Sequence, residues 1–445
     1  MSELPVVVVG AGPVGLAAAA ELVERGLPVL VLERGEQAGA AVAQWHHVRL
    51  FSRWAELVAP AARRLLEPRG WRHPEADGYP TGEEWARLYL RPLVDALGDK
   101  VRFGAEVVGV ARRGRDRVVD AGRDSEPLTV HVRNADGSEE RIAALAVIDA
   151  SGTWTSPNPL GGDGLPAVGE TATLDRIAYQ VPNLKDATVA ARYADRHVVV
   201  AGAGHSALTA LVAFAGLAEQ RPSTRITWLL RRGAVGAVFG GGDADQLPAR
   251  GALGLRAKAA VEAGHIEVVT GFRTEAVERD AEGRLTLVSS EGQRVEAVDE
   301  VVVLAGFRPD LSWLSEVRLA LDATLQAPVA LAPLIGPNMH SCGTVYPHGV
   351  KELAHPEPNV FLAGMKSYGR APTFLPMTGY EQVRSIAAEL AGDRESAERV
   401  ELVLPETGVC GGAGLFAAPA DAASGGCCGA PADVQDLSLA APSAR

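Results

Sequence analysis

The chain has 445 residues, room for roughly two or three domains of usual size, and 47% of them are hydrophobic, enough to build the cores. Its formal net charge of −12 argues against nucleic acid or an anionic membrane as a partner. The first residues lack the positive segment of a signal peptide, and no stretch approaches the ~20 uninterrupted apolar residues of a membrane span. The four cysteines do not make a secreted disulfide framework. We therefore expect a cytoplasmic protein.

The first predicted unit is a strand, a glycine-rich loop, a helix and a second strand. Residues 6–9 are all valine, which is typical of a buried parallel strand, and residues 17–23 read as a helix that ends at Gly26. Residues 28–32 predict the second strand, which is followed by Glu33. The loop carries the dinucleotide fingerprint G-x-G-x-x-G, with Gly10, Gly12, Pro13 and Gly15.

Each part of this unit has a role in holding a dinucleotide. Gly10 allows the tight turn, Gly12 lets the backbone approach a pyrophosphate, and Gly15 lets the helix pack on the strand. The N-terminus of the helix offers free N–H groups to the anion. Glu33 follows about twenty residues after the glycines, where such folds place a carboxylate on the ribose hydroxyls.

Elements of a different kind follow the first unit. Residues 44–51 are too rich in aromatic and basic side chains for a plain linker, and residues 79–89 start a helix with Thr81 as its cap. Short strands are predicted at 101–103, 107–111 and 128–132, and residues 147–152 close the first half at Gly152.

A second fingerprint directly follows the strand-like residues 198–201. Its residues are Gly202, Gly204, His205, Ser206 and Ala207, with alanine in the third glycine position. Its second strand, residues 226–230, runs into Arg231 and Arg232 instead of an acid, and a guanidinium there suits the 2′-phosphate of NADPH. His205 is expected in the loop near the pyrophosphate, and the last strand of this unit ends at Gly306.

The rest of the chain returns to the first pattern and then changes in composition. Residues 360–364 form a third strand followed by glycine, and residues 378–390 a closing helix. From residue 407 the chain is rich in Gly, Ala, Ser and Pro, which predicts a mobile tail. The predicted limits are 1–160 and 309–404 for the first domain, 161–308 for the second and 405–445 for the tail. Cys427 and Cys428 in the tail are candidates for a thiophilic ion, against the alternative that they are incidental.

The order of these motifs resembles the flavoproteins with two dinucleotide-binding domains, which hold FAD in the first domain and NAD(P)H in an inserted second one. The fold implied is α/β, with two Rossmann-like, three-layer ββα domains. Residues 202–207 with Arg231 and Arg232, and residues 305–310, are most similar to flavin-containing monooxygenases and their N-hydroxylase relatives. Residues 45–52, 340–344 and 364–374 resemble the flavin-binding monooxygenase-like proteins called ArsO, found in bacterial arsenic-resistance clusters.

The resemblance implies a set of cofactor-binding residues. For FAD they are Gly10, Gly12, Pro13, Gly15, Glu33, Arg34 by the adenine, Trp45 and Arg49 by the flavin, Gly152, and Gly364 and Met365 by the ribityl chain. For NADPH they are Gly202, Gly204, His205, Ser206, Ala207, Arg231, Arg232 and Gly306. Two departures stand out. Met365 occupies the place where many such flavoproteins have an aspartate, and residues 157–197 lack the monooxygenase fingerprint F-x-G-x-x-x-H.

Two enzyme classes compete on this sequence. In the first, NADPH reduces FAD and oxygen is used to oxygenate sulfur, nitrogen or trivalent arsenic in a small molecule. In the second, electrons pass to a disulfide or a thiol-bound metalloid, which needs a thiol pair, and the tail alone offers one. A non-enzymatic flavin sensor or metalloid carrier would leave the second nucleotide site idle. The oligomeric state stays open, with a homodimer among the expected states.

Overall fold

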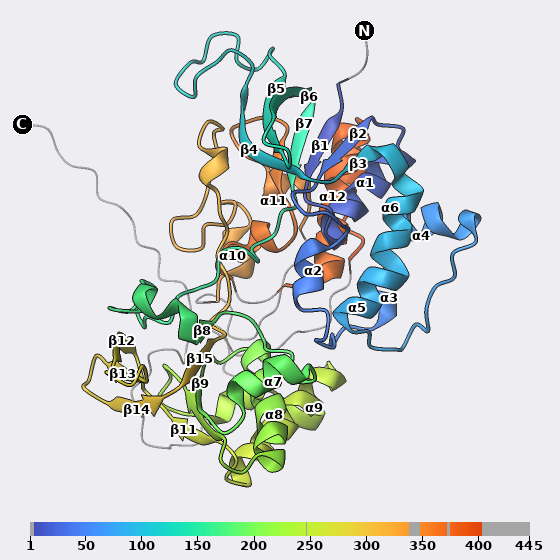
Figure 1. The fold of residues 1–445 in the computed structure, drawn as a ribbon. Coiled ribbons are helices and arrows are strands. Elements are labelled where there is room, and N and C mark those ends of the chain that lie inside the picture. Colours follow the sequence, from blue (N-terminus) through green and yellow to red (C-terminus); the bar gives the residue numbers. More distant parts are fainter. Residues whose placement is uncertain (1–3, 246, 338–347, 372–373, 403–445) are drawn as a thin grey trace, which may run out of the picture.

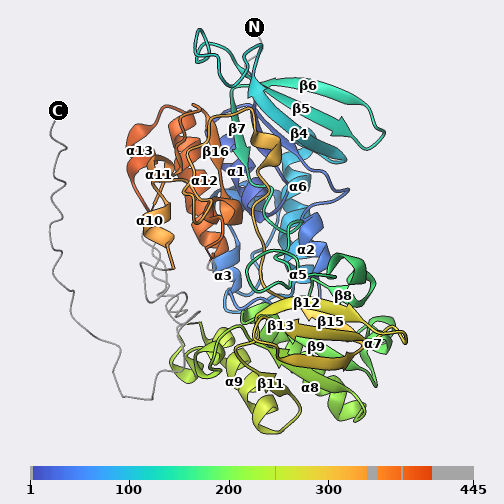
Figure 2. The ribbon, with the colours of Figure 1, turned by 90° about the vertical axis from the view of Figure 1, so that its left-hand side faces the viewer.

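The computed structural model describes residues 4–245, 247–337, 348–371 and 374–402. Figures 1 and 2 show two units, one above the other, each built around a sheet. The tail, with Cys410, Cys427 and Cys428, and the predicted limit at 404 lie outside the described residues, as does Cys342.

The first unit is a parallel sheet of five strands in the order β16, β7, β1, β2, β3. Their bounds are β16 Val360–Leu362, β7 Ala146–Asp149, β1 Val6–Val9, β2 Val29–Leu32 and β3 Val101–Arg102. An antiparallel sheet lies beside it, with β4 Ala105–Arg112, β5 Leu128–Asn134 and β6 Glu139–Ala144. The helices of this unit are α1 Pro13–Glu24, α2 Ala40–Gln44, α3 Trp54–Leu57, α4 Pro60–Leu66, α5 Gly82–Trp85, α6 Arg91–Leu97, α10 Ala332–Ile335, α11 Val350–Leu353, α12 Pro376–Leu390 and α13 Arg394–Glu398.

The side chains of β1 show how the three layers form. Val6 and Val8 are buried in one core with α1 and α12, whereas Val7 and Val9 are buried in another with residues of β4 and β5. Alternate residues of a strand point to opposite faces, so one four-valine strand joins helices on one face to a second sheet on the other. This is the predicted ββα arrangement.

The second unit repeats this plan. Its parallel sheet has the order β11, β10, β9, β15, β8, and a three-stranded antiparallel sheet covers one face. The strands are β8 Ile177–Ala178, β9 His197–Ala201, β10 Arg225–Leu229, β11 Glu267–Val269, β12 Thr274–Arg279, β13 Leu285–Ser289, β14 Arg294–Val298 and β15 Glu300–Val303, and the helices are α7 Ala187–Tyr193, α8 His205–Gln220 and α9 Pro248–Glu262. Val198 and Val200 pack with α8, and Val199 packs with β12 and β13.

The second unit is inserted into the first. Strand β7 ends before the second sheet begins, and β16 returns after it to pair with β7, with Val147 opposite Val360. The predicted fold class, two Rossmann-like domains with the second inserted, is confirmed. Strand β6, helix α9 and the β12–β14 sheet were not predicted from the sequence.

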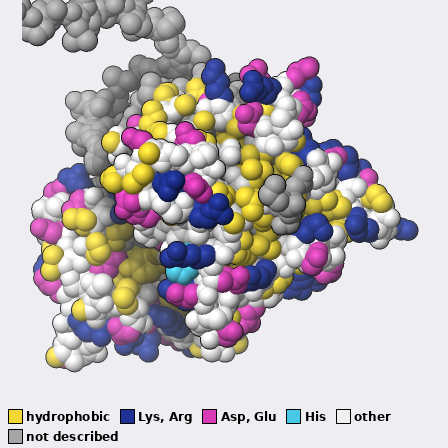
Figure 3. Space-filling model, turned by 90° about the horizontal axis from the view of Figure 1, so that it is seen from above, with side chains coloured by type: hydrophobic (Ala, Val, Ile, Leu, Met, Phe, Trp, Pro, Cys, Tyr) yellow, Lys and Arg dark blue, Asp and Glu magenta, His cyan; other side chains and the backbone are white. Residues whose placement is uncertain are grey.

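The surface carries charges of both signs. The face seen from above in Figure 3 mixes acidic, basic and apolar side chains, and neither sign dominates it. Within the described ranges, no helix has both the length and the hydropathy needed to cross a membrane.

Candidate functional site

The first glycine loop lies where β1 ends and α1 begins. Gly10 has φ +100°, and a Cβ there would lie 2.9 Å from the carbonyl oxygen of Ala150, so this turn requires glycine. A Cβ at Gly15 would lie 1.9 Å from the carbonyl oxygen of Gly10. A Cβ at Gly12 would meet no atom within 4 Å, and Pro13 starts the helix directly after it. The protein thus leaves open space beside a helix N-terminus, which fits a dinucleotide pyrophosphate.

Glu33 joins the end of β2 to this loop. Its Oε2 accepts a hydrogen bond from the backbone N–H of Ala11 at 2.7 Å, and its Oε1 accepts one from Gly35 at 2.7 Å. A carboxylate has about four acceptor positions, so two backbone bonds leave capacity for ribose hydroxyls.

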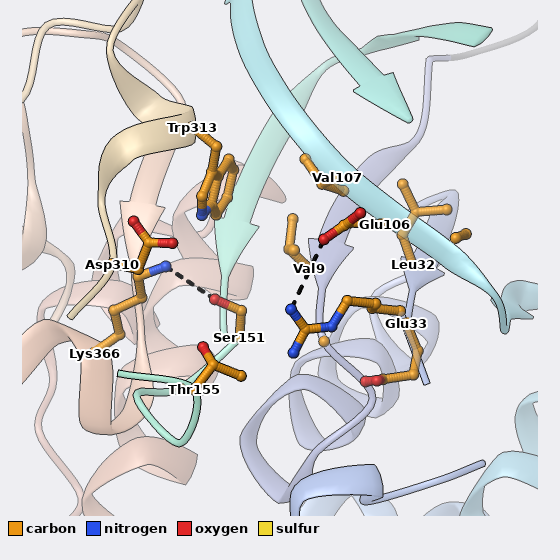
Figure 4. A pocket seen from close by; sticks show the side chains of 14 residues that line it. Val9, Leu32, Glu33, Glu106, Val107, Ser151, Thr155, Asp310, Trp313 and Lys366 are labelled. Carbon is orange, nitrogen blue, oxygen red and sulfur yellow. Dashed lines mark hydrogen bonds and ion pairs between the residues drawn. The ribbon is translucent and has the colours of Figure 1, made fainter. Parts of the chain in front are cut away.

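A pocket opens at the carboxyl ends of β1, β2 and β7 (Figure 4). The predicted residues Gly10, Glu33, Arg34 and Gly152 line it. The other residues that line it were not predicted as site residues: Val9, Leu32, Ala105, Glu106, Val107, Ser151, Thr155, Asp310, Trp313 and Lys366. Arg34 forms an exposed ion pair with Glu106 at 3.8 Å.

Lys366 is a buried cation at this pocket. Its side chain is 1% exposed, and Nζ lies 2.7 Å from Oδ2 of Asp149, whose side chain is 0% exposed. Nζ also donates to Oγ of Ser151 at 2.9 Å and lies 4.8 Å from the centre of the Trp313 ring. Ser151 Oγ donates in turn to Oδ1 of Asp149 at 2.6 Å. A buried charge needs a partner, and here Asp149 supplies it.

Trp45 and Arg49 do not line this pocket. The ring of Trp45 packs against Gly82, where an added Cβ would lie 2.8 Å from Cε3 of the indole. Arg49 donates to the carbonyl of Tyr79 and lies 3.7 Å from a carboxylate oxygen of Glu84. Both residues fasten the segment after α2 to the start of α5, whose predicted cap Thr81 accepts from the backbone N–H of Glu84.

Gly364 and Met365 follow β16 after Ala363. The backbone N–H of Gly364 donates to Oε1 of Gln382 at 2.8 Å, and Gln382 is itself 0% exposed. Its Nε2 donates to Oγ of Ser367 at 2.9 Å and lies 2.9 Å from Nε2 of His348. Met365 is half-buried. Gln382 of α12, which sequence reasoning missed, therefore holds the backbone beside the position where related flavoproteins have an aspartate.

The second glycine loop has the geometry of the first. Gly202 has φ +140°, and a Cβ there would lie 2.3 Å from the carbonyl oxygen of Leu304. A Cβ at Gly204 would meet no atom within 4 Å. His205, expected in the loop, is instead the first residue of α8, because Gly204 is its N-cap. The following Ser206 is exposed, and Ala207 is buried against the core.

Arg231 and Arg232 follow β10 after Leu230, at the same edge of the sheet. Arg231 is exposed and donates to the carbonyl of Gly162 at 3.4 Å, and the described residues offer it no ion pair. The carbonyl of Arg232 accepts from the N–H of Gly271 at 2.7 Å. Gly306, after β15, accepts from the N–H of Asn158 at 2.8 Å.

Side-chain contacts join the two units near the second loop. The ring of Phe51 lies 5.1 Å from that of His205, and Oε1 of Gln44 accepts from Gln180 at 3.0 Å. Burial, and then the charge of Arg250, lower the pKa of His205 to about 4. His205 is therefore neutral at pH 7, which removes a histidine charge from the contact.

The described residues offer neither a thiol nor a metal site. All four cysteines lie outside the described residues, and the ranges that are described contain no group of three or more His, Cys, Asp and Glu side chains arranged to hold a metal.

Known proteins similar to this chain fall among flavin and pyridine-nucleotide enzymes. Residues 4–329 match the family model of the pyridine nucleotide-disulphide oxidoreductases. Indole-3-pyruvate monooxygenase YUCCA1 of Oryza sativa subsp. japonica is 30% identical over 45% of this chain, which spans only 43% of that relative. A ferredoxin–NADP reductase of Paraburkholderia phytofirmans is 26% identical over 72% of this chain and 74% of its own length.

Solved structures of other proteins share this fold. The bacillithiol disulfide reductase of Bacillus cereus superposes with a TM-score of 0.64 at 22% identity, covering 87% of this chain and 99% of that one. At this identity the likeness concerns the fold. The family model covers most of the chain, and both glycine loops leave open space beside a helix N-terminus. The protein therefore belongs to the pyridine nucleotide-disulphide oxidoreductase family and is an FAD- and NAD(P)H-dependent oxidoreductase.

Proposed function

We propose that this enzyme uses NADPH to reduce FAD bound at the first glycine loop, and that the reduced enzyme then uses molecular oxygen to oxygenate a soft nucleophile. The observation that carries the proposal is the pair of loops, each with an open glycine position, Gly12 or Gly204, before a helix N-terminus. When bound, FAD supplies the redox chemistry, taking a hydride from the nicotinamide and passing electrons onward. The loop residues hold the two pyrophosphates, and Glu33 accepts from a ribose of FAD.

Arg231 supports NADPH over NADH. Arg231 lies at the end of β10, where the second strand of such a unit reads the adenosine ribose, and the described residues give it no carboxylate partner. A 2′-phosphate would complete its charge-assisted hydrogen bonds. Arg308 adds positive charge nearby, since it donates to the carbonyl of Gly164, two residues from the Gly162 carbonyl that accepts from Arg231.

The onward reaction that we favour is monooxygenation of sulfur, nitrogen or trivalent arsenic. Likeness to the monooxygenase YUCCA1 and the sequence resemblance to the ArsO proteins support it. The sequence has no C-x-x-C pair, and its only adjacent cysteines, Cys427 and Cys428, lie in the C-terminal tail. An arsenic substrate would place the enzyme in arsenic resistance.

The second candidate is reduction of a disulfide or a thiol-bound metalloid through Cys427 and Cys428. Membership of the pyridine nucleotide-disulphide oxidoreductase family and the adjacent thiols in the sequence favour it. Two adjacent cysteines could capture a soft ion and receive electrons from the flavin.

The amounts of oxygen, hydrogen peroxide and NADPH consumed or released distinguish the two candidate reactions. Purified enzyme is mixed with NADPH in air, and oxygen, hydrogen peroxide and NADPH are followed with and without a thioether, an amine or arsenite. A monooxygenase consumes one oxygen per NADPH, releases less peroxide when its substrate is present, and places ¹⁸O from labelled oxygen in the product. NADPH oxidation that depends on a disulfide and continues without oxygen would favour the reductase. Unchanged peroxide release with every compound would contradict oxygenation of these substrates.

A further inference from the structure

The pocket in Figure 4 brings together segments that are far apart in the chain. Glu33 and Arg34 follow β2, Val107 belongs to β4, Ser151 follows β7, Trp313 lies in the turn after residue 310, and Lys366 follows β16. Trp313, Lys366 and Ser151 lie on one side of the pocket, and Glu33, Glu106 and Leu32 lie on the other (Figure 4).

The position of the pocket identifies the end of the dinucleotide that it would take. It includes Gly10 of the phosphate loop and Glu33 of the ribose position and continues to Val107 of β4. None of the residues 202–207 of the second loop lines it. Because the flavin must meet a nicotinamide bound by the second unit, the pocket belongs to the opposite end, the adenosine of FAD.

We propose that Trp313 is the aromatic wall against which the adenine of FAD packs, and that Lys366 is the positioning residue that holds this wall. The inference rests on the proposed function, since it requires FAD at the first loop. Trp313 is half-buried, and Val9, Leu32 and Val107 provide further apolar lining for a flat base. Packing of a base on an indole combines apolar burial with the preferred stacking of aromatic rings.

Lys366 can position the indole because its own place is fixed. Asp149 and Ser151 hold its ammonium, both from the end of β7, and the ammonium lies over the Trp313 ring at 4.8 Å from the centroid. A desolvated cation over an indole face is an attractive contact. The lysine thus links the ends of β7 and β16 to the turn that carries Trp313.

The test compares FAD, FMN and ADP on full-length apoprotein, because FMN lacks the adenosine and ADP lacks the flavin. For Trp313→Ala we expect the Kd for FAD and for ADP to rise roughly tenfold, with the Kd for FMN unchanged. Trp313→Phe retains a ring and should show a smaller rise. Trp71→Ala is the matched control, since Trp71 bonds to the carbonyl of Leu88 and does not line the pocket. It should change none of the three constants.

The role of Lys366 is tested by removing its charge together with that of its partner. Lys366→Met alone leaves Asp149 buried without a cation and threatens folding, so the Asp149→Asn, Lys366→Met double variant is measured beside it. In the double variant we expect the Kd for FAD and for ADP to rise several-fold and the Kd for FMN to stay unchanged. We also expect the indole fluorescence of the apoprotein to shift. The same double change in a Trp313→Phe background should cause no such shift.

The outcomes distinguish this inference from the proposed function. In Trp313→Ala, an equal loss of affinity for FAD, FMN and ADP, or no loss of affinity for FAD and ADP, would overturn the adenine wall. The proposed function would be untouched, because the wild type would still bind FAD. Unchanged fluorescence in the double variant would overturn the positioning role of Lys366. Wild-type protein that binds FAD with the expected sensitivity to Trp313, but whose FAD is not reduced by NADPH or that oxygenates none of the compounds tested, would support the wall and overturn the proposed function.

Discussion

Glu33 Oε2 accepts the backbone N–H of Ala11 at 2.7 Å, which ties the end of β2 to the glycine loop. Gln at this position keeps one carboxamide oxygen but turns an NH₂ group toward one of the two N–H donors. We expect Glu33→Gln to lower the free energy of unfolding by about 1–2 kcal/mol and to weaken FAD. Urea unfolding and flavin content of the purified protein measure both effects. Glu36→Gln, at an exposed neighbour, should leave them unchanged.

Gly12→Val should abolish FAD retention and leave a folded, soluble chain. The structure has no atom within 4 Å of a Cβ at this position, so the added side chain enters the space meant for the pyrophosphate and not the core. Gly216→Val is the control, because Gly216 of α8 is equally open but lies away from the loop. Flavin absorbance and circular dichroism are the readouts, and a normal flavin content in Gly12→Val would refute the assignment of the first site.

Arg231→Ala with Arg232→Ala should weaken NADPH far more than NADH. Each charge-assisted hydrogen bond lost to the 2′-phosphate is expected to cost about 1.5–3 kcal/mol of binding. The measurement is the rate of flavin reduction against the concentration of each nucleotide without oxygen. Arg225→Ala, at the exposed start of β10, serves as control. Equal loss for both nucleotides would mean that the arginines do not read the phosphate.

His205 gives a pH prediction for stability. Its pKa of about 4 in the folded protein lies below the usual value of 6.5, so protons bind the unfolded state more tightly. The contribution of neutral His205 is fully present above pH 6.5 and is lost as the pH falls toward 4. Urea midpoints between pH 7 and 4 should fall less steeply for His205→Gln than for wild type or for a variant at the exposed His46. Identical slopes would argue against a half-buried histidine that stays neutral at the start of α8.

Removal of the residues after Leu404 separates the two candidate reactions. If the reaction is completed at the flavin, the truncated enzyme keeps its FAD, NADPH oxidation and oxygenation, which is the result that we expect. If Cys427 and Cys428 relay electrons, flavin reduction by NADPH persists but turnover with a disulfide or metalloid stops. The Cys427→Ser, Cys428→Ser variant gives the same comparison without the deletion, and selective loss of turnover there would replace the monooxygenase proposal by the reductase one.

The strands around the glycine loops could be predicted because local pattern decides them. Four valines in a row, a glycine turn and an alanine-rich helix agree with one another at residues 6–24, and the structure has β1 and α1 there. The antiparallel strands β12 to β14 could not be read in this way. They are short and half-exposed, and exposed charged residues such as Glu278 and Arg294 leave too few apolar residues in each strand for the pattern to stand out.

The pocket could be predicted only on the side that a motif encodes. Glu33 and Arg34 follow a recognisable strand and line the pocket, whereas Lys366, Asp149 and Trp313 meet through tertiary folding of three distant segments. The available signal was Lys366, two residues after the glycine that follows β16. The sequence does not show that the side chain of Lys366 is only 1% exposed, because this burial depends on the tertiary fold.

The pairing of Val147 with Val360 also governs the order in which the molecule can assemble. The last strand of the first sheet is synthesised after the whole second sheet, so the second unit can form while β7 still presents an unpaired apolar edge. Closure of that edge requires a contact of high sequence separation, which is slow to form. A nascent chain that stops before β16 exposes a strand ready to pair with another copy, and intermolecular association at β7 is then the expected route of misfolding.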